Sequence, residues 1–237
     1  MIVPIVLAAG RSTRFEDEKT KLLHQLGEIE ILKRVVTNLE QAGLRGIRVV
    51  VGHQQDDVRE ALGDTYEYIV QEKQQGTGDA VKACRELIPN HYDDVLVVFG
   101  DKPLFRPQTI REFIKAHKTN ITVATVNHPL PESYSEGWGT VIRNDGKLYA
   151  LKKAPNTLEC DAALYLFNAK WLWTNLNYLE KHPEKEEYFL PDLVEIASKQ
   201  STPIGEYRVL NFKEATGINN KVQYAEALSY LNTMDSN

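Results

Sequence analysis

The sequence has few cysteines and no pattern that would pair them or bind zinc. Only Cys84 and Cys160 are present among the 237 residues, and they form no CxxC motif. A disulfide framework and a zinc site are therefore not indicated, and we expect two buried thiols in a reducing compartment.

Long hydrophobic runs are also missing. The apolar N-terminal stretch MIVPIVLAAG is too short to span a membrane, carries no basic segment before it and continues directly into a polar loop. We therefore expect no membrane partner and a cytoplasmic location.

Positive charge is not in excess. The formal net charge is −5, and Lys and Arg do not form sustained runs. Because nucleic-acid backbones are held by clustered Lys and Arg, a nucleic-acid partner is not expected, and any phosphate binding must be local.

Several catalytic signatures are absent as well. The first turn lacks GxGxxG, which argues against a dinucleotide-binding dehydrogenase, and the Gly146-Lys147 pair is followed by Leu, which excludes a P-loop. There is no nucleophile elbow. His24 and His53 have no Cys or His at metal-binding spacing, so they do not predict a metal site.

The sequence does carry the pattern of one large α/β domain. With 42 % hydrophobic and 26 % charged residues and no Gly- or Pro-rich linker, the chain can bury a full core. Strands are expected over residues 2–7, 47–51, 66–70 and 95–99, with helices between them over 29–42, 56–62 and 77–87. This alternation predicts a doubly wound, mostly parallel sheet with its ligand site at the carboxyl ends of the strands.

The second half of the chain has a different pattern. After a helix over 107–117 and a strand over 121–126, residues 139–143 and 148–153 flank Asn144-Asp145-Gly146, which is a hairpin signal. A strand over 162–167 follows, and helices over 171–179, 191–199 and 221–231 surround a strand over 204–209. An antiparallel lobe is therefore expected beside the parallel sheet.

The stretch from Ile5 to Lys21 contains the first candidate site. Small residues at Ala8, Ala9 and Gly10 would let backbone amides approach a ligand, and Arg14 and Lys21 place two cations in the loop behind them. This combination suits a polyphosphate, although single basic residues are more often solvated surface charges.

Two further positions lie where strands of such a sheet end. Asp101 directly follows the apolar strand, which suits either a Mg²⁺ ligand or a turn cap before Pro103. Gln71 and the Gly76-Thr77-Gly78 turn could recognise a base, or could simply connect a strand to a helix.

Taken together, these motifs and several others occur in a fixed order over nearly the whole chain. They are LAAGRSTR at 7–14, KLLH at 21–24, GH at 52–53, QEKQQGTGDA at 71–80, FGDKPL at 99–104, EGWG at 136–139, DGK at 145–147, EYFLPD at 187–192 and GINN at 217–220. The order resembles the sugar-phosphate nucleotidyltransferase superfamily, most closely the N-acetylglucosamine-1-phosphate uridylyltransferase domains of GlmU enzymes. The β-helix acetyltransferase domain of those enzymes has no counterpart here.

This resemblance implies a Rossmann-like three-layer fold forming a single domain over 1–237, with a nucleotide-binding half over 1–127 and an acceptor-binding half over 128–237. It implies Mg²⁺ as cofactor, with Asp101 and Asn219 as metal ligands, and Arg14, Lys21 and Asp101 as catalytic residues. The implied nucleotide-binding residues are Leu7, Ala8, Ala9, Gly10, Arg14, Lys21, Gln71, Gly76, Thr77 and Gly100. The implied acceptor-binding residues are Gly139, Lys153 and Asp161.

The acceptor positions depart from the family. Lys153 stands where the family has a sugar-binding Glu, and Asp161 where it has a sugar-binding Asn. Two interpretations stay open: Lys153 pairs with Asp161 across adjacent strands and closes the old pocket, or Lys153 meets an acidic acceptor.

The resemblance therefore implies small-molecule substrates: UTP and a sugar 1-phosphate or similar phosphorylated acceptor, with pyrophosphate released. Two alternatives remain. One is a cytidylyltransferase that uses CTP and a small phosphate or phosphonate acceptor. The other is a non-catalytic nucleotide-sugar sensor. No oligomeric state is implied.

Overall fold

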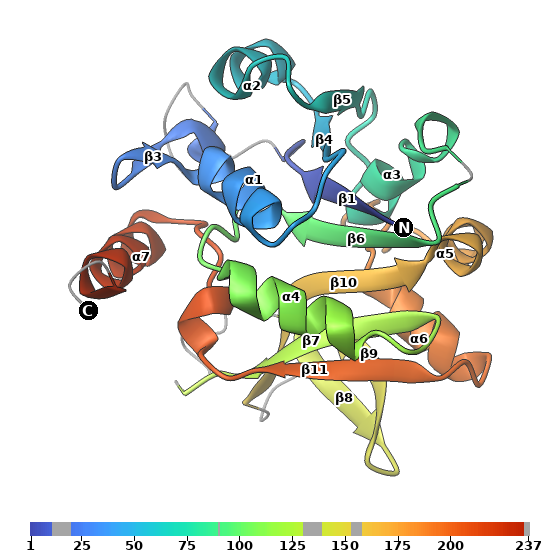
Figure 1. Cartoon of the computed structure of the whole chain (residues 1–237). Coiled ribbons are helices and arrows are strands. Elements are labelled where there is room, and N and C mark those ends of the chain that lie inside the picture. Colours follow the sequence, from blue (N-terminus) through green and yellow to red (C-terminus); the bar gives the residue numbers. More distant parts are fainter. Residues whose placement is uncertain (11–19, 90, 130–138, 153–157, 235–237) are drawn as a thin grey trace.

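The computed structural model describes residues 1–10, 20–89, 91–129, 139–152 and 158–234. Among these residues, nine strands form one mixed sheet. Its main path runs β11-β7-β10-β6-β1-β4-β5, and β8 and β9 extend it from β10 (Figure 1). The strand bounds are β1 Ile2–Leu7, β4 Arg48–Val51, β5 Glu67–Val70, β6 Asp94–Phe99, β7 Ile121–Asn127, β8 Thr140–Asn144, β9 Lys147–Lys152, β10 Glu159–Asn168 and β11 Ile204–Val209.

The sheet is mostly parallel along its main path. β1 pairs in parallel with β4 and β6, β4 with β5, and β11 with β7, whereas β10 runs antiparallel between β6 and β7. The β8–β9 hairpin is antiparallel, with Asn144 opposite Lys147, so the predicted turn signal is confirmed. The predicted parallel sheet with an antiparallel lobe is therefore correct.

Helices cover both faces of this sheet and bury two cores. α1 Ile31–Gln41 and α4 Pro107–Ala116 pack on one face, and Figure 1 shows them in front of the strands. α7 Lys221–Met234, at the left of Figure 1, adds buried Ala227 and Tyr230 to the same core. α3 Thr77–Lys82, α5 Ala169–Asn175 and α6 Asp192–Lys199 pack on the other face. Along β1, Val6 faces the first core and Ile5 the second, which is why the central strands are apolar at successive positions. The three-layer architecture is confirmed.

Two predicted helices have different bounds in the structure. The helix expected from residue 29 begins at Ile31, because Ile29–Glu30 forms β3, which pairs with β2 Gln25–Leu26 in a small separate sheet. The helix expected over 77–87 ends at Lys82, and a 3-10 turn follows at Arg85–Leu87. Pro89 disfavours helical backbone at the residue before it, and Ile88 is accordingly extended.

Pro4 lies inside a central strand, although proline cannot donate a ladder hydrogen bond. The pairing of β1 with β4 begins only at Ile5, so no residue of β4 is paired with Pro4. The strand therefore tolerates proline near its start. Among the described residues, no helix combines the length and apolar character needed to cross a membrane.

Candidate active site

A cavity of about 570 Å³ lies where the parallel strands of the first half end. Leu7 ends β1, Phe99 ends β6 and Gln71 directly follows β5. This is the edge at which open α/β sheets bind ligands. The lining residues are Leu7, Ala9, Gly10, Lys21, Leu22, Gln71, Gln74, Gly76, Thr77, Ala80, Phe99, Asp101 and Glu187.

Most of the predicted nucleotide residues therefore surround one cavity. Ala8 and Gly100 lie behind it: the Ala8 N–H donates to the Val50 carbonyl at 2.8 Å, and the Gly100 N–H donates to the Leu7 carbonyl at 2.9 Å. These two residues fix the backbone that forms the wall. Arg14 lies outside the described residues.

Lys21 joins the two predicted metal ligands. Its Nζ donates to Asp101 Oδ2 at 2.7 Å and to Asn219 Oδ1 at 2.7 Å. Lys21 comes from a 3-10 turn over Lys21–Leu23, Asp101 follows β6, and Asn219 lies two residues before α7. Three distant parts of the chain thus bring two side-chain oxygens to the same ammonium nitrogen.

The carboxylate of Asp101 has an unused oxygen. Oδ1 is buried and accepts no hydrogen bond from the described residues. Burial alone would raise the pKa of Asp101, but the ammonium groups of Lys21 and Lys102 outweigh it and hold that pKa below its usual value. The group is therefore an ionised carboxylate with one oxygen available to a ligand.

These residues fit a magnesium ion. Mg²⁺ takes one or two protein oxygens and completes its shell with water and substrate phosphates, so Asp101 and Asn219 are sufficient. No cluster of three or more His, Cys, Asp or Glu side chains suited to a metal occurs in the described part of the chain. The donor set would therefore suit a Mg²⁺ whose remaining ligands come from water and substrate, rather than a closed structural metal site.

Asn219 is positioned by contacts to the same loop as Asp101. The Ile218 N–H donates to the Asp101 carbonyl at 2.9 Å, and the Asn219 N–H donates to Gln223 Oε1 at 2.7 Å. Lys102 Nζ donates to the Ala215 carbonyl at 2.5 Å. The segment before α7 is therefore fastened to the loop after β6.

Lys102 lies in the interior beside two acids. Burial lowers its pKa, while the carboxylates of Asp101 and Asp161 act in the opposite direction. The charge of this lysine therefore interacts with both the predicted metal ligand and the predicted acceptor residue. The buried position of Lys102 was not predicted from the sequence, because a lysine next to Asp101 is expected to be an ordinary surface charge.

The side of the cavity formed by Gln74 and Gly76 is held together by close backbone approaches. Gln74 Nε2 donates to the Ala9 carbonyl at 2.6 Å, and a Cβ at Gly52 would lie 2.2 Å from that nitrogen and 2.8 Å from the Ala9 carbonyl oxygen itself. Gly76 has a φ of +95°, and a Cβ there would lie 2.5 Å from the Tyr188 carbonyl oxygen. Both positions require glycine, because a side chain would block the approach.

Gln74 and Glu187 also line the cavity, although sequence reasoning did not assign them. Both lie inside motifs that were recognised, QEKQQGTGDA and EYFLPD. Thr77 Oγ1 accepts a hydrogen bond from the Leu190 N–H at 2.9 Å, so these two motifs are in contact. A motif match was available as a signal, but the orientation of each side chain was not.

The predicted acceptor residues Gly139 and Asp161 lie side by side. The Asp161 N–H donates to the Gly139 carbonyl at 2.8 Å. The Asp161 carboxylate accepts from the Ala163 N–H at 2.8 Å and from the Tyr165 hydroxyl. Burial raises the pKa of Asp161 despite these bonds and despite Lys102. Lys153 lies outside the described residues, so its pairing with Asp161 stays a prediction.

Comparison with known proteins identifies the class. Residues 4–154 match the MobA-like NTP transferase domain family. The chain therefore belongs to this family of nucleotidyltransferases, as the motif order predicted.

More particularly, the chain is similar to bifunctional GlmU proteins. It is 32 % identical over 239 aligned positions to GlmU of Acetivibrio thermocellus, covering 95 % of this chain and 50 % of that protein. For GlmU of Staphylococcus saprophyticus the identity is 30 %, over 94 % and 51 %. The chain spans about half the length of the curated relatives it matches.

Solved structures agree on the fold. A Bacillus anthracis protein assigned as a glucose-1-phosphate thymidylyltransferase, solved with sucrose, superposes with a TM-score of 0.76 at 19 % identity and covers 97 % of this chain and 95 % of its own. A nucleotidyl transferase from Methanothermobacter thermautotroptrophicus gives 0.71 at 19 % identity, over 98 % and 99 %.

Proposed function

We propose that the protein couples UTP to a sugar 1-phosphate or a similar phosphorylated acceptor in a Mg²⁺-dependent reaction. An oxygen of the acceptor phosphate attacks the α-phosphorus of the nucleotide, the bond from that phosphorus to the bridging oxygen of the β-phosphate breaks, and pyrophosphate leaves. The products are a nucleotide-linked sugar and pyrophosphate. We retain a cytoplasmic location as part of this proposal.

One observation carries the proposal. Asp101 and Asn219 converge on the same cationic atom, Lys21 Nζ, at a cavity formed by strand ends. A protein that only bound nucleotide sugars would need neither a paired oxygen site for a metal nor a cation beside it. This geometry therefore favours turnover over the sensor alternative.

The reaction needs no protein nucleophile, because phosphoryl and nucleotidyl transfers depend mainly on positioning and charge stabilisation. Asp101 and Asn219 would hold Mg²⁺, which supplies positive charge between two phosphates that repel each other. Lys21 would bind the α-phosphate or the departing pyrophosphate, and Arg14 is assigned to the triphosphate through the family resemblance. The wall formed by Ala9, Gly10 and Gly76 lets the nucleotide approach the backbone.

The test is pyrophosphate release from each of the four NTPs with a panel of sugar 1-phosphates and small phosphates or phosphonates. We expect UTP with a sugar 1-phosphate to be the best pair and EDTA to abolish the reaction. Turnover of CTP with a phosphonate instead would establish the cytidylyltransferase alternative, and no release with any pair would favour the sensor. Full activity in EDTA would contradict the metal assignment.

The altered acceptor residues define a second arm of this panel. Asp161 is occupied by Tyr165 and Ala163, which leaves Lys153 as the residue whose charge could select an acidic acceptor. If it does, Lys153→Ala lowers kcat/KM for acceptors that carry a carboxylate or phosphonate, and leaves kcat/KM for phosphates of uncharged sugars unchanged. An equal effect on both classes would support the pocket-closing interpretation.

A further inference from the structure

The amide of Gln71 is held in one orientation by two acceptors. Its Nε2 donates to Asp79 Oδ2 at 2.7 Å and to the Gly76 carbonyl at 3.1 Å. A carboxylate oxygen and a carbonyl oxygen can only accept hydrogen bonds, so the atom that faces them must be the nitrogen. Both amide hydrogens of Gln71 are thus used inside the protein.

The amide oxygen of Gln71 remains for a ligand. Gln71 lines the cavity although only 5 % of the residue is exposed, and its Oε1 accepts no hydrogen bond from the part of the chain that the structure describes. What Gln71 offers to a bound molecule is therefore a hydrogen-bond acceptor. A free glutamine could turn its amide over and offer a donor instead.

We infer that Asp79 is a positioning residue that sets the base preference of the cavity, by holding the Gln71 amide with its oxygen toward the ligand. The inference rests on the proposed function, in which a nucleotide base occupies this cavity. Uracil carries an N–H at ring position 3, which can donate to that oxygen. Cytosine carries a lone pair at the same ring position, which would face the lone pairs of the amide oxygen. The locked amide therefore selects a base of the uracil type.

Asp79 also has an ordinary structural role. It lies in the first turn of α3, where a carboxylate interacts favourably with the helix dipole. Loss of that interaction would lower stability, but it would change turnover of UTP and CTP by the same factor. The ratio of the two substrates separates positioning of Gln71 from helix stabilisation.

The experiment measures kcat/KM for UTP and for CTP, with one acceptor, in the wild type and in Asp79→Asn. Asparagine keeps the shape of aspartate but can donate as well as accept, so the shorter of the two contacts that fix the Gln71 amide no longer requires its nitrogen, and only the longer contact to the Gly76 carbonyl still opposes a turned amide. We expect the UTP-to-CTP ratio to fall about tenfold or more, since discrimination by a buried hydrogen-bonding group is lost. Asp57→Asn is the matched control, because Asp57 is an exposed acid in the first turn of α2 Gln55–Leu62. Its ratio should equal that of the wild type.

An unchanged ratio in Asp79→Asn overturns the inference, and so does a wild type that prefers CTP. Asp79→Ser is the second variant, with the same expected direction, should the asparagine variant fold poorly. If the wild type releases no pyrophosphate with any NTP, the proposed function fails separately. Calorimetric dissociation constants for UTP and CTP then decide the inference. Tighter binding of UTP than of CTP by the wild type, with that preference lost in Asp79→Asn, supports the positioning role without turnover. The same ratio of the two dissociation constants in the wild type and in Asp79→Asn rejects it.

Discussion

At Asp101, the two oxygens of one carboxylate have different environments. Oδ2 pairs with Lys21, while Oδ1 is buried without a hydrogen-bond partner among the described residues. Asp101→Asn removes the charge that a metal needs and keeps the shape of the side chain. We expect kcat to fall by ~10²–10³, the loss typical when one group that stabilises transition-state charge is removed. Pyrophosphate release measures the effect.

The control for this substitution is Asp145→Asn, the same chemical change at an exposed turn residue between β8 and β9. Its activity should match the wild type, and both variants should keep a folded circular dichroism spectrum. If Asp101→Asn retained wild-type kcat while folded, Asp101 could not be a metal ligand for the reaction.

Individual residues also mark how far the sequence could predict the site. The location of Asp101 at the cavity was foreseeable, because it follows a buried strand at a parallel sheet edge. The convergence of Asp101 and Asn219 on Lys21 was not foreseeable from local pattern, since Lys21 is 80 positions from Asp101 and 198 positions from Asn219 along the chain. Only the order of family motifs pointed to Asn219. The orientation of Gln71 depends on Asp79, and no spacing rule encodes the direction of an amide.

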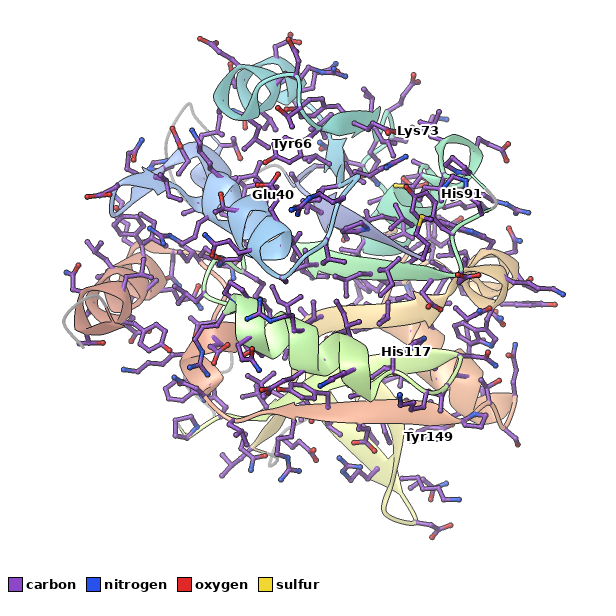
Figure 2. All side chains as sticks on the ribbon, in the orientation of Figure 1. Glu40, Tyr66, Lys73, His91, His117 and Tyr149 are labelled. Carbon is purple, nitrogen blue, oxygen red and sulfur yellow. The ribbon has the colours of Figure 1, made fainter. Side chains whose placement is uncertain are left out.

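At the scale of elements, the end of α4 is tied to two strands through His117 (Figure 2). Its Nδ1 lies 2.7 Å from Thr122 Oγ1 in β7, and its Nε2 lies 3.5 Å from Asp94 Oδ1 at the start of β6. Burial lowers the pKa of His117, although the Asp94 carboxylate acts against this. The helix end is therefore held by an imidazole that prefers to be neutral.

This preference predicts a loss of stability in mild acid. Because the folded-state pKa of His117 is below the unfolded value of about 6.5, the unfolded chain takes up the proton first as the pH falls. The contribution of His117 is present above about pH 6.5 and decreases below it. His117→Gln should thus make the urea midpoint less dependent on pH between 7.5 and 5.5 than in the wild type. An equal or steeper dependence in the variant would contradict this.

Element boundaries were predicted well where a clear apolar pattern marks the element, and poorly where local hydrogen bonding determines where the element begins or ends. The strands β1, β4 and β6 were found because they are apolar at successive positions. The end of α3 at Lys82 was not, because the residues that follow carry no helix-stop signal and continue into a 3-10 helix at Arg85–Leu87. Strands β2 and β3 contain two residues each, which is too short for any periodicity.

On the scale of the whole molecule, the sheet does not divide where the sequence changes character. β10, from the second half of the chain, lies between β6 and β7 from the first half, and Leu166 faces Leu96 on one side and Thr122 on the other. The positions of most strands along the chain, and the division into parallel and antiparallel parts, were predicted from the sequence. Their spatial order could not be predicted, because pairing of distant strands depends on packing across the whole sheet.

This continuity predicts that the chain unfolds in one cooperative transition, with halves 1–127 and 128–237 acting as one domain. All three tryptophans, Trp138, Trp171 and Trp173, lie in the second half, so tryptophan fluorescence reports that half while far-ultraviolet circular dichroism reports the whole. The two urea curves should coincide. Leu166→Ala, at a fully buried position in β10, should lower the free energy of unfolding by about 2–5 kcal/mol and shift both curves together. A fluorescence transition that separates from the circular dichroism transition would contradict this prediction. It would mean that the two halves unfold independently, with the pairing between β10 and β6 lost while one half is still folded.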